Sequence, residues 1–170
     1  MHDQQPAPVW QTPPVEPGPA PGVQFAPHGE RLVAYIIDAA ILFVVILVAV
    51  ILLGGAIFTG ADFSDPETPQ VGPAAIGASV LFVLVVLVVS LGYFPFFWAR
   101  GGQTPGMKPF RLYVVRDSDG GRISAGQALI RLVGYWVNGI VLYIGFIWVF
   151  IDARRRGWHD LIAGTVVIKR

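Results

Sequence analysis

An arginine and an aspartate stand at the start of the first long apolar stretch of the chain. Arg31 and Asp38 are seven positions apart, so an α-helix places both on one face, about 10 Å apart along its axis. An uncharged run, residues 39–57, follows directly. A carboxylate at that depth in a bilayer costs about 2.5 kcal/mol or more, so it must face other helices or water, find a cationic partner or take up a proton. These two residues are therefore candidates for binding an ion or a proton.

The same two residues also suit a purely structural role, because a buried ion pair can fix helix packing without exchanging any ligand. We expect Arg31 and Asp38 to be energetically coupled. Since their separation is long for direct contact, Arg131 is a further candidate for the closer partner of Asp38. The sequence leaves the structural and the ion-linked interpretations open.

A second group of polar residues lies in the C-terminal half. Arg131 and Asn138, with Tyr135 between them, follow helical spacing and predict a polar stripe that points into a helical bundle. His159 and Asp160 are adjacent, and such a pair can relay protons, cap a helix or anchor a loop. The candidate ion- or ligand-linked residues are therefore Arg31, Asp38, Asp160 and Arg131, with His159 and Asn138 as secondary candidates.

The composition predicts an integral membrane protein. Hydrophobic residues make up 54% of the chain and charged residues only 14%, which the surface of a soluble domain would not tolerate. The chain has no cysteine, and it contains no phosphate-binding glycine motif, zinc-spaced histidine set or nucleophile elbow. We therefore expect no enzyme activity, no cofactor, no metal and no nucleic-acid partner.

Residues 1–28 form a proline-rich segment with little aliphatic content, which cannot bury enough surface to fold. We expect a disordered tail there and one membrane domain over residues 29–170. The tail lacks the basic start and short apolar region of a signal peptide. It is either a solvated spacer or a ligand for the aromatic groove of a partner.

Two apolar stretches, residues 32–57 and 74–98, are each long enough to span a bilayer. The loop between them carries Asp62, Asp65 and Glu67 but no lysine or arginine, which places it outside by the positive-inside rule. The second stretch ends in an aromatic cluster that is typical of a membrane interface. It therefore returns the chain to the cytoplasm.

The next segment, residues 100–122, carries five basic residues and is expected in the cytoplasm. Within it, Phe110–Arg116 is rich in β-forming residues and predicts a strand, while Asp117–Gly121 predicts a tight turn. The turn resembles the opening of a calcium loop, but no glutamate closes it at the required distance. Thr165–Lys169 predicts a second strand, which can pair with residues 112–116 only if both lie on one side of the membrane.

A third apolar stretch, residues 128–151, has two interpretations. As a single crossing, it would place the basic C-terminus outside, opposite the basic loop. As a re-entrant hairpin, or as two short helices turning near Asn138–Gly139, it would keep both basic regions inside. The charge count and the two predicted strands favour the second interpretation, whereas hydropathy alone favours the first.

The sequence thus predicts an all-α integral membrane protein, with two transmembrane helices, a third apolar segment and a short cytoplasmic β element. We expect a multi-pass protein of the plasma membrane, surrounded by the lipid bilayer, with its N-terminal tail in the cytoplasm. Two or three spans are too few to enclose a transport pathway, so a homo-oligomer or a larger membrane complex is expected.

Several motifs together resemble the RDD family of membrane proteins, which is named for one arginine and two aspartates. Arg31 and Asp38 match the pair in that family's first helix. The motif Gly102-Gln-Thr-Pro-Gly106, the Ala-Leu-Ile segment before Arg131 and the closing Trp-His-Asp…Ala-Gly-Thr also fit. The resemblance assigns the second aspartate to Asp160.

The resemblance covers residues 29–168, nearly everything except the tail. Asp152 fits the second aspartate less well, because it lacks the His-Asp…Ala-Gly-Thr context. One departure is visible: members often carry Gly-Lys after Gln-Thr-Pro, whereas here Met107 follows Gly106 and the lysine comes at position 108.

The resemblance implies a role that is poorly defined for the family. Transport of an unidentified ligand has been suggested for it, and sodium–proton exchange for some relatives. The implied function is transport of a cation, a proton or a small ligand by the intramembrane arginine and aspartate residues. The alternative is a non-catalytic accessory or scaffold subunit, in which the same charges lock the helices together.

Overall fold

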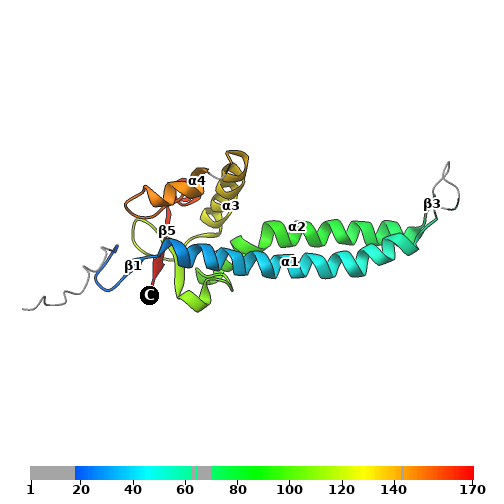
Figure 1. The fold of residues 1–170 in the computed structure, drawn as a ribbon, viewed down its shortest axis with the longest axis horizontal. Coiled ribbons are helices and arrows are strands. Elements are labelled where there is room, and N and C mark those ends of the chain that lie inside the picture. Colours follow the sequence, from blue (N-terminus) through cyan, green and yellow to red (C-terminus); the bar gives the residue numbers. More distant parts are fainter. Residues whose placement is uncertain (1–17, 63, 65–69, 143) are drawn as a thin grey trace, which may run out of the picture.

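A long helical hairpin and a compact end make up the molecule (Figure 1). The computed structural model of the 170-residue chain describes residues 18–62, 64, 70–142 and 144–170. The hairpin consists of α1 (His28–Thr59) and α2 (Pro73–Gly101). Both helices are long and apolar enough to cross a membrane. They contain the two predicted spans, and most of their large apolar side chains are exposed.

The hairpin is closed at its far tip by two short strands, β2 (Ala61–Asp62) and β3 (Gln70–Val71), which pair with each other. Asp65 and Glu67 of the predicted acidic loop lie outside the described residues. At the other end, α2 stops at Gly102, which adopts a left-handed conformation with φ +68° and donates its N–H to Trp98 O over 2.9 Å. Glycine accepts this conformation without strain, so the chain can turn sharply into the compact end.

A three-stranded sheet with the order β1-β5-β4 lies in the compact end. The strand β4 (Leu112–Arg116) pairs antiparallel with β5 (Thr165–Lys169), with Val114 opposite Val167. The predicted pairing of these two segments is therefore confirmed. The first strand begins two residues later than the full predicted range, because the 3-10 helix η1 (Lys108–Phe110) occupies its start.

The third strand, β1 (Gln24–Phe25), pairs with the free edge of β5. The next residue, Ala26, is fully buried and donates its N–H to Val167 O over 3.0 Å. We predicted a disordered tail over residues 1–28, but its last part, from Gln24 onwards, completes the sheet. The predicted boundary is therefore too late in the chain. Residues 1–17 lie outside the described part of the chain.

The third apolar segment is bent rather than straight. It forms α3 (Ala125–Ile140), then α4 (Ile144–Ile147) and the 3-10 helix η2 (Trp148–Phe150), which together turn by 112° relative to α3. The bend follows directly after the predicted turn at residues 138–139. Because β4 and β5 flank this segment and pair, the chain enters and leaves it at the same end of the molecule.

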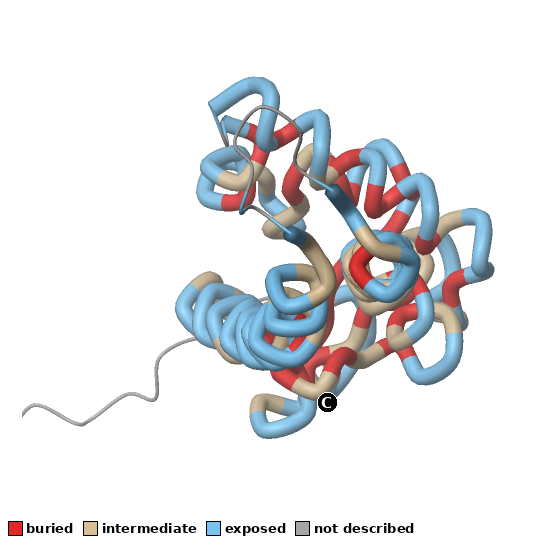
Figure 2. Tube along the Cα trace, turned by 90° about the vertical axis from the view of Figure 1, so that its right-hand side faces the viewer, coloured by how far each residue is buried: buried red, intermediate tan, exposed pale blue. Residues whose placement is uncertain are grey.

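The end of the chain then returns through α5 (Trp158–Ala163), which packs across α3. Buried residues concentrate in the sheet, α3 and α5, whereas the long helices α1 and α2 are largely exposed (Figure 2). The main apolar core lies between the sheet and the adjoining ends of α1, α2 and α3. Its buried members are Ala26, Ala34, Trp98, Met107, Leu112, Val114, Ile123, Ala128 and Val167.

The contact between α3 and α5 depends on a glycine. A Cβ atom built on Gly134 would lie 2.6 Å from the Cα of His159, which is backbone and cannot rotate away. On the same helix, Gly139 is exposed, and a Cβ atom there would meet nothing within 4 Å. The two positions therefore form a matched pair for testing the helix packing.

We predict that Gly134→Ala destabilises the protein by about 1–3 kcal/mol, because the added methyl group forces α5 away from α3. Gly139→Ala is expected to be neutral or to stabilise by up to about 1 kcal/mol, since alanine favours a helix over glycine. Thermal unfolding of both variants in the same detergent measures the difference. Equal unfolding midpoints would show that the two helices are not in this close contact.

Candidate functional site

Asp38 lies in the first third of α1, with only 2% of its surface exposed. Its Oδ1 accepts hydrogen bonds from the Tyr93 hydroxyl and the Gly106 N–H, each at 2.8 Å. Its Oδ2 accepts a hydrogen bond from the Thr104 hydroxyl. All three donors are neutral, and no arginine donates to Asp38 in the described part of the chain. Asp38 is thus a buried carboxylate held by hydrogen bonds rather than by an ion pair.

The motif Gly102-Gln-Thr-Pro-Gly106 supplies two of these donors. Its last glycine presses against α1, where a Cβ atom would lie 2.2 Å from Ala34 O and 2.8 Å from the carboxyl carbon of Asp38. Any other residue at position 106 would push the loop away and break the hydrogen bond from the Gly106 N–H. The motif therefore forms a loop that wraps the Asp38 carboxylate.

Asp160 lies at the centre of a second polar cluster and is completely buried. Its Oδ2 accepts a hydrogen bond from Arg31 Nη2 at 2.7 Å, and its Oδ1 accepts one from Arg131 Nη1. The Gly157 N–H also donates to Oδ2, at 3.0 Å, which caps the start of α5. Arg131 donates in addition to the Thr165 hydroxyl at 2.7 Å. One carboxylate thus joins α1, α3, α5 and β5.

Burial alone would raise the pKa of Asp160, but the guanidinium groups of Arg131 and Arg31 outweigh this and hold the pKa well below its usual range. The neighbouring His159 is 1% exposed, and its Nδ1 accepts a hydrogen bond from Asn138 Nδ2 at 3.1 Å. Burial lowers the pKa of His159 to about 4, although Asp160 opposes the shift. At neutral pH, His159 is therefore uncharged, and its Nε2 nitrogen lies 3.3 Å from Asp160 Oδ2.

Arg131 is not the closer partner of Asp38, because Arg31 and Arg131 both bind Asp160 instead. The energetic coupling of Arg31 and Asp38 stays a prediction. The seven-residue spacing does place Arg31 and Asp38 on one face of α1. However, α5 covers that face at Arg31, while the loop that contains Gly106 covers it at Asp38. The two charges therefore meet different partners although they share a helix face.

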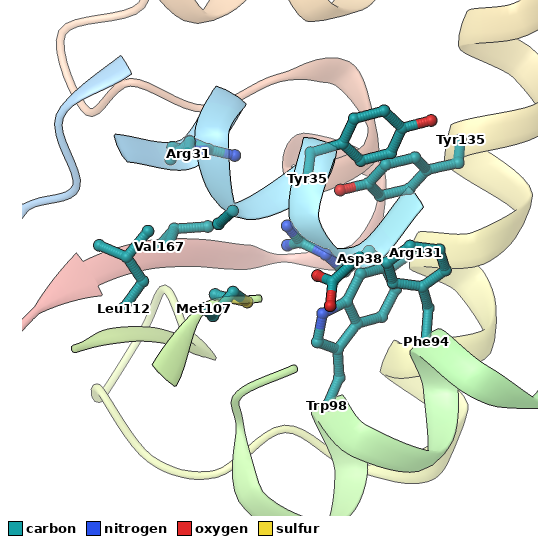
Figure 3. Close-up of a pocket in the computed structure, with 11 residues that line it drawn as sticks. Arg31, Tyr35, Asp38, Phe94, Trp98, Met107, Leu112, Arg131, Tyr135 and Val167 are labelled. Atoms are coloured by element: carbon teal, nitrogen blue, oxygen red, sulfur yellow. The ribbon is translucent and has the colours of Figure 1, made fainter. Parts of the chain in front are cut away.

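A small cavity of about 40 Å³ separates the two clusters, and Arg31, Asp38 and Arg131 all line it (Figure 3). In the close-up, Asp38 from α1, Arg131 from α3 and Trp98 from α2 converge on the same space. The guanidinium carbon of Arg131 lies 4.7 Å from the centre of the Trp98 ring, a cation–π contact. The cavity is large enough for one or a few water molecules or a small ion.

The structure brings all six candidate residues to two adjoining clusters. Asp152, the less favoured second aspartate, instead accepts hydrogen bonds from Arg156 Nε and Nη2, each at 3.0 Å, and is partly exposed. Sequence reasoning missed Tyr93, Thr104 and Thr165, whose hydroxyl groups bind the two aspartates. The position of Thr104 between the glycines of a recognised motif was the one signal that could have identified such a donor.

The fold is an apolar helical hairpin of the kind found in membrane proteins. Its polar end buries one aspartate that is bound by arginines and one that is held by neutral donors, and these features together define a class of protein. The RDD family matches this chain over residues 25–164. The chain therefore belongs to the RDD family.

The relatives of the chain include the uncharacterized protein YxaI of Bacillus subtilis, which is 30% identical over 142 residues, 81% of this chain and 93% of that protein. A proline-rich antigen homolog of Mycobacterium tuberculosis is 26% identical over 98 residues, 56% of this chain and 41% of that protein. The uncharacterized protein RP437 of Rickettsia prowazekii is 30% identical over 91 residues, 54% of this chain and 50% of that protein. No solved structure matches the chain.

We predict that Asp160→Asn destabilises the fold by about 3–5 kcal/mol, because the buried guanidinium group of Arg131 and the partly buried one of Arg31 then lose the carboxylate that they share. Asp119→Asn is the matched control, since Asp119 is 53% exposed and pairs with Arg116 within a surface turn. Its loss is expected to cost no more than about 1 kcal/mol. Thermal unfolding of both variants in the same detergent measures the difference. If Asp160→Asn and Asp119→Asn lowered the unfolding midpoint equally, the central role of Asp160 would be contradicted.

Proposed function

We propose that this protein is a multi-pass protein of the plasma membrane, with α1 and α2 crossing the bilayer and the sheet in the cytoplasm. The distribution of charge supports this orientation. The far tip of the hairpin carries acidic residues and no lysine or arginine, whereas the basic residues of the 100–122 segment and the C-terminus gather at the other end. In this arrangement the N-terminal tail is also cytoplasmic, because β1 pairs with β5.

The same pairing supports a bent, re-entrant arrangement of α3 and α4 rather than a third crossing. A single crossing would separate β4 from β5 by the thickness of the bilayer, about 30 Å, whereas the two strands share a five-residue register. The polar face of α3 points into the protein, towards Asp160 and His159. Its exposed apolar side chains, among them Leu129, Val133 and Trp136, then face lipid.

Cysteine labelling tests this topology, because the chain has no native cysteine. We predict that a cysteine at exposed Ser64 reacts with a membrane-impermeant maleimide in intact cells, whereas one at exposed Arg170 reacts only after permeabilisation. Labelling of position 170 in intact cells would require α3 and α4 to cross the membrane. A double variant with both cysteines provides the internal reference for expression.

We propose that Asp38 is the site of a proton- or cation-linked transport function. The observation that carries this proposal is the set of three neutral donors to its buried carboxylate. Such donors stabilise the negative charge without cancelling it, so the charge is still available to a proton or a cation. Asp160 does not offer this, because two arginines already neutralise it.

The donors to Asp38 also allow a change of protonation. The hydroxyl groups of Tyr93 and Thr104 can rotate and accept a hydrogen bond from the O–H of a protonated carboxyl group, whereas the Gly106 N–H can only donate one. Protonation of Oδ2 therefore needs only the rotation of the Thr104 hydroxyl. Since two spans cannot enclose a pathway, transport requires a homo-oligomer or a larger membrane complex.

The second candidate function is that of a non-catalytic accessory or scaffold subunit. The observation that favours it is the pairing of Asp160 with two arginines of the same chain, which locks four elements together. The basic cytoplasmic end would then bind a partner protein. In this case Asp38 is structural as well, and removing its charge should have little effect on the flux of any ion across the membrane.

A flux assay separates the two functions. We predict that wild-type protein in liposomes shows sodium- or pH-dependent flux and that Asp38→Asn reduces this flux at least tenfold while the protein remains folded. Asparagine keeps the shape of the side chain but cannot carry the charge. Asp62→Asn, at the exposed far tip of the hairpin, is the control and is expected to leave the flux unchanged.

Thermal unfolding of the same preparations shows whether each variant is folded. If wild-type protein moves neither sodium nor protons under any imposed gradient and co-purifies with a stable membrane partner, the accessory-subunit function replaces the transport function.

A further inference from the structure

Positive charge is in excess at the compact end of the molecule. All 12 lysine and arginine residues of the chain lie in residues 28–38 and 100–170. The acidic residues of the same two ranges are fewer, and each accepts a hydrogen bond from within the chain: Glu30, Asp38, Asp117, Asp119, Asp152 and Asp160. Some of the basic side chains are therefore left without a carboxylate.

Three of these side chains, Lys108, Arg111 and Arg170, form a basic corner where β4 begins and β5 ends. The Arg111 N–H donates to Lys108 O over 3.1 Å, and the Arg170 N–H donates to Arg111 O over 3.2 Å. All three residues are exposed, and none binds a carboxylate in the described part of the chain. The adjacent Lys169 binds Glu30. Even if a carboxyl group on Arg170 offsets one charge, the basic corner keeps an excess of positive charge.

The backbone of Arg111 is strained. It ends the 3-10 helix η1 with φ +55°, in the left-handed region that glycine or asparagine adopts at lower cost. The guanidinium group of Arg111 makes no ion pair with the described residues that would offset this strain. A strained residue with an exposed, unpaired charge points to a ligand outside the chain.

The basic corner also lies beside the two long helices. Thr104, whose hydroxyl binds Asp38, accepts the Lys108 N–H over 3.2 Å, so Lys108 is one short turn from the Asp38 site. Asp38 is ten residues into α1, about 15 Å along the helix. On α2, the guanidinium carbon of Arg100 lies 5.5 Å from the centre of the Phe96 ring, in the last turn of the helix. In the topology proposed above, this level is the cytoplasmic boundary of the bilayer.

We propose that the basic corner, Lys108, Arg111 and Arg170, binds the phosphate group of an anionic lipid of the cytoplasmic leaflet. The proposal rests on the proposed membrane topology and not on ion transport. Anionic lipids of that leaflet attract basic segments next to a membrane span. Guanidinium groups suit a phosphate, because two parallel N–H groups can donate to its oxygens. The acyl chains of such a lipid stay in the bilayer beside α1 and α2.

Native mass spectrometry tests the proposal with the full-length protein. The protein is released from detergent micelles that contain phosphatidylglycerol and phosphatidylcholine in equal amounts, and the lipids that stay bound are counted. We expect the wild-type protein to retain at least threefold more phosphatidylglycerol than phosphatidylcholine. The triple variant Lys108→Gln, Arg111→Asn, Arg170→Gln should lose at least fivefold of the bound phosphatidylglycerol.

The matched control removes the same number of positive charges from the opposite end of the sheet. It is the triple variant Arg116→Gln, Arg122→Gln, Arg154→Gln. Arg116 and Arg154 form ion pairs on the surface, and Arg122 bridges to the end of β4. We expect this variant to keep its bound phosphatidylglycerol within twofold of wild type.

A single variant separates lipid binding from folding. Arg111→Asn removes one charge of the basic corner, and asparagine tolerates the left-handed backbone at this position. We expect its unfolding midpoint to equal or exceed that of wild type, while the bound phosphatidylglycerol falls at least twofold. A lowered midpoint with unchanged lipid binding would overturn the proposal.

Other outcomes would also overturn the proposal. Equal losses in the two triple variants would show that net charge alone retains the lipid. Displacement of the lipid by inorganic phosphate, but not by chloride at the same ionic strength, would assign the basic corner to a free anion. A partner protein lost only from the first triple variant, with lipid binding unchanged, would assign it to an acidic protein. The count does not depend on sidedness or flux, so a failure of the topology shows separately, in the cysteine labelling.

Discussion

The fold depends on one buried carboxylate, Asp160, which binds the buried Arg131 and the partly buried Arg31. Arg31 and Asp160 are 129 positions apart, and Arg131 and Asp160 are 29 positions apart, so these ion pairs fix the start of α1, the middle of α3 and α5 in one place. Each guanidinium group alone would be very costly to bury, and the shared aspartate is what makes the arrangement possible. The sheet adds a second link, since β5 follows α5 directly and pairs with both β1 and β4.

Asp38 is not part of these ion pairs, and hydrogen bonds from neutral groups set its environment instead. A loop with a glycine at position 106 can approach α1 closely enough to present its N–H to the carboxylate. The Thr104 hydroxyl and the Tyr93 hydroxyl complete the set. The two aspartates therefore have opposite environments: Asp160 is bound by two cations, whereas Asp38 is held by hydrogen bonds from neutral donors alone.

The sequence predicted those features that follow from patterns along the chain. Apolar runs longer than 20 residues gave the two long helices, and β-branched residues at 112–116 and 165–169 gave the strand pair. The start of the ordered domain was missed because β1 has only two residues and forms only when the distant β5 offers its edge. Such a strand leaves no periodic signal in the sequence.

The partners of the buried charges could not be predicted in the same way. Helical spacing shows which residues share a face, as for Arg31 and Asp38, but it does not show which distant element covers each part of that face. Hydroxyl donors such as Thr165 are equally hidden, because a single threonine in a strand is ordinary in β-rich sequence. The resemblance to a family selected Asp160 over Asp152, and the structure gives the physical reason: only Asp160 is buried with Arg31.

The environments of His159 and Asp160 bear on the two roles that an adjacent histidine and aspartate can have. A proton relay needs a group that changes its charge near neutral pH, but the pKa of His159 is lowered to about 4 by burial and the pKa of Asp160 lies well below its usual range. Because both pKa values are lower in the folded state, the contribution of these groups to stability is lost on acidification, for His159 between about pH 6.5 and pH 4. At pH 7 neither side chain takes up or releases a proton. The pair therefore acts as an anchor for α5 rather than as a proton relay at neutral pH.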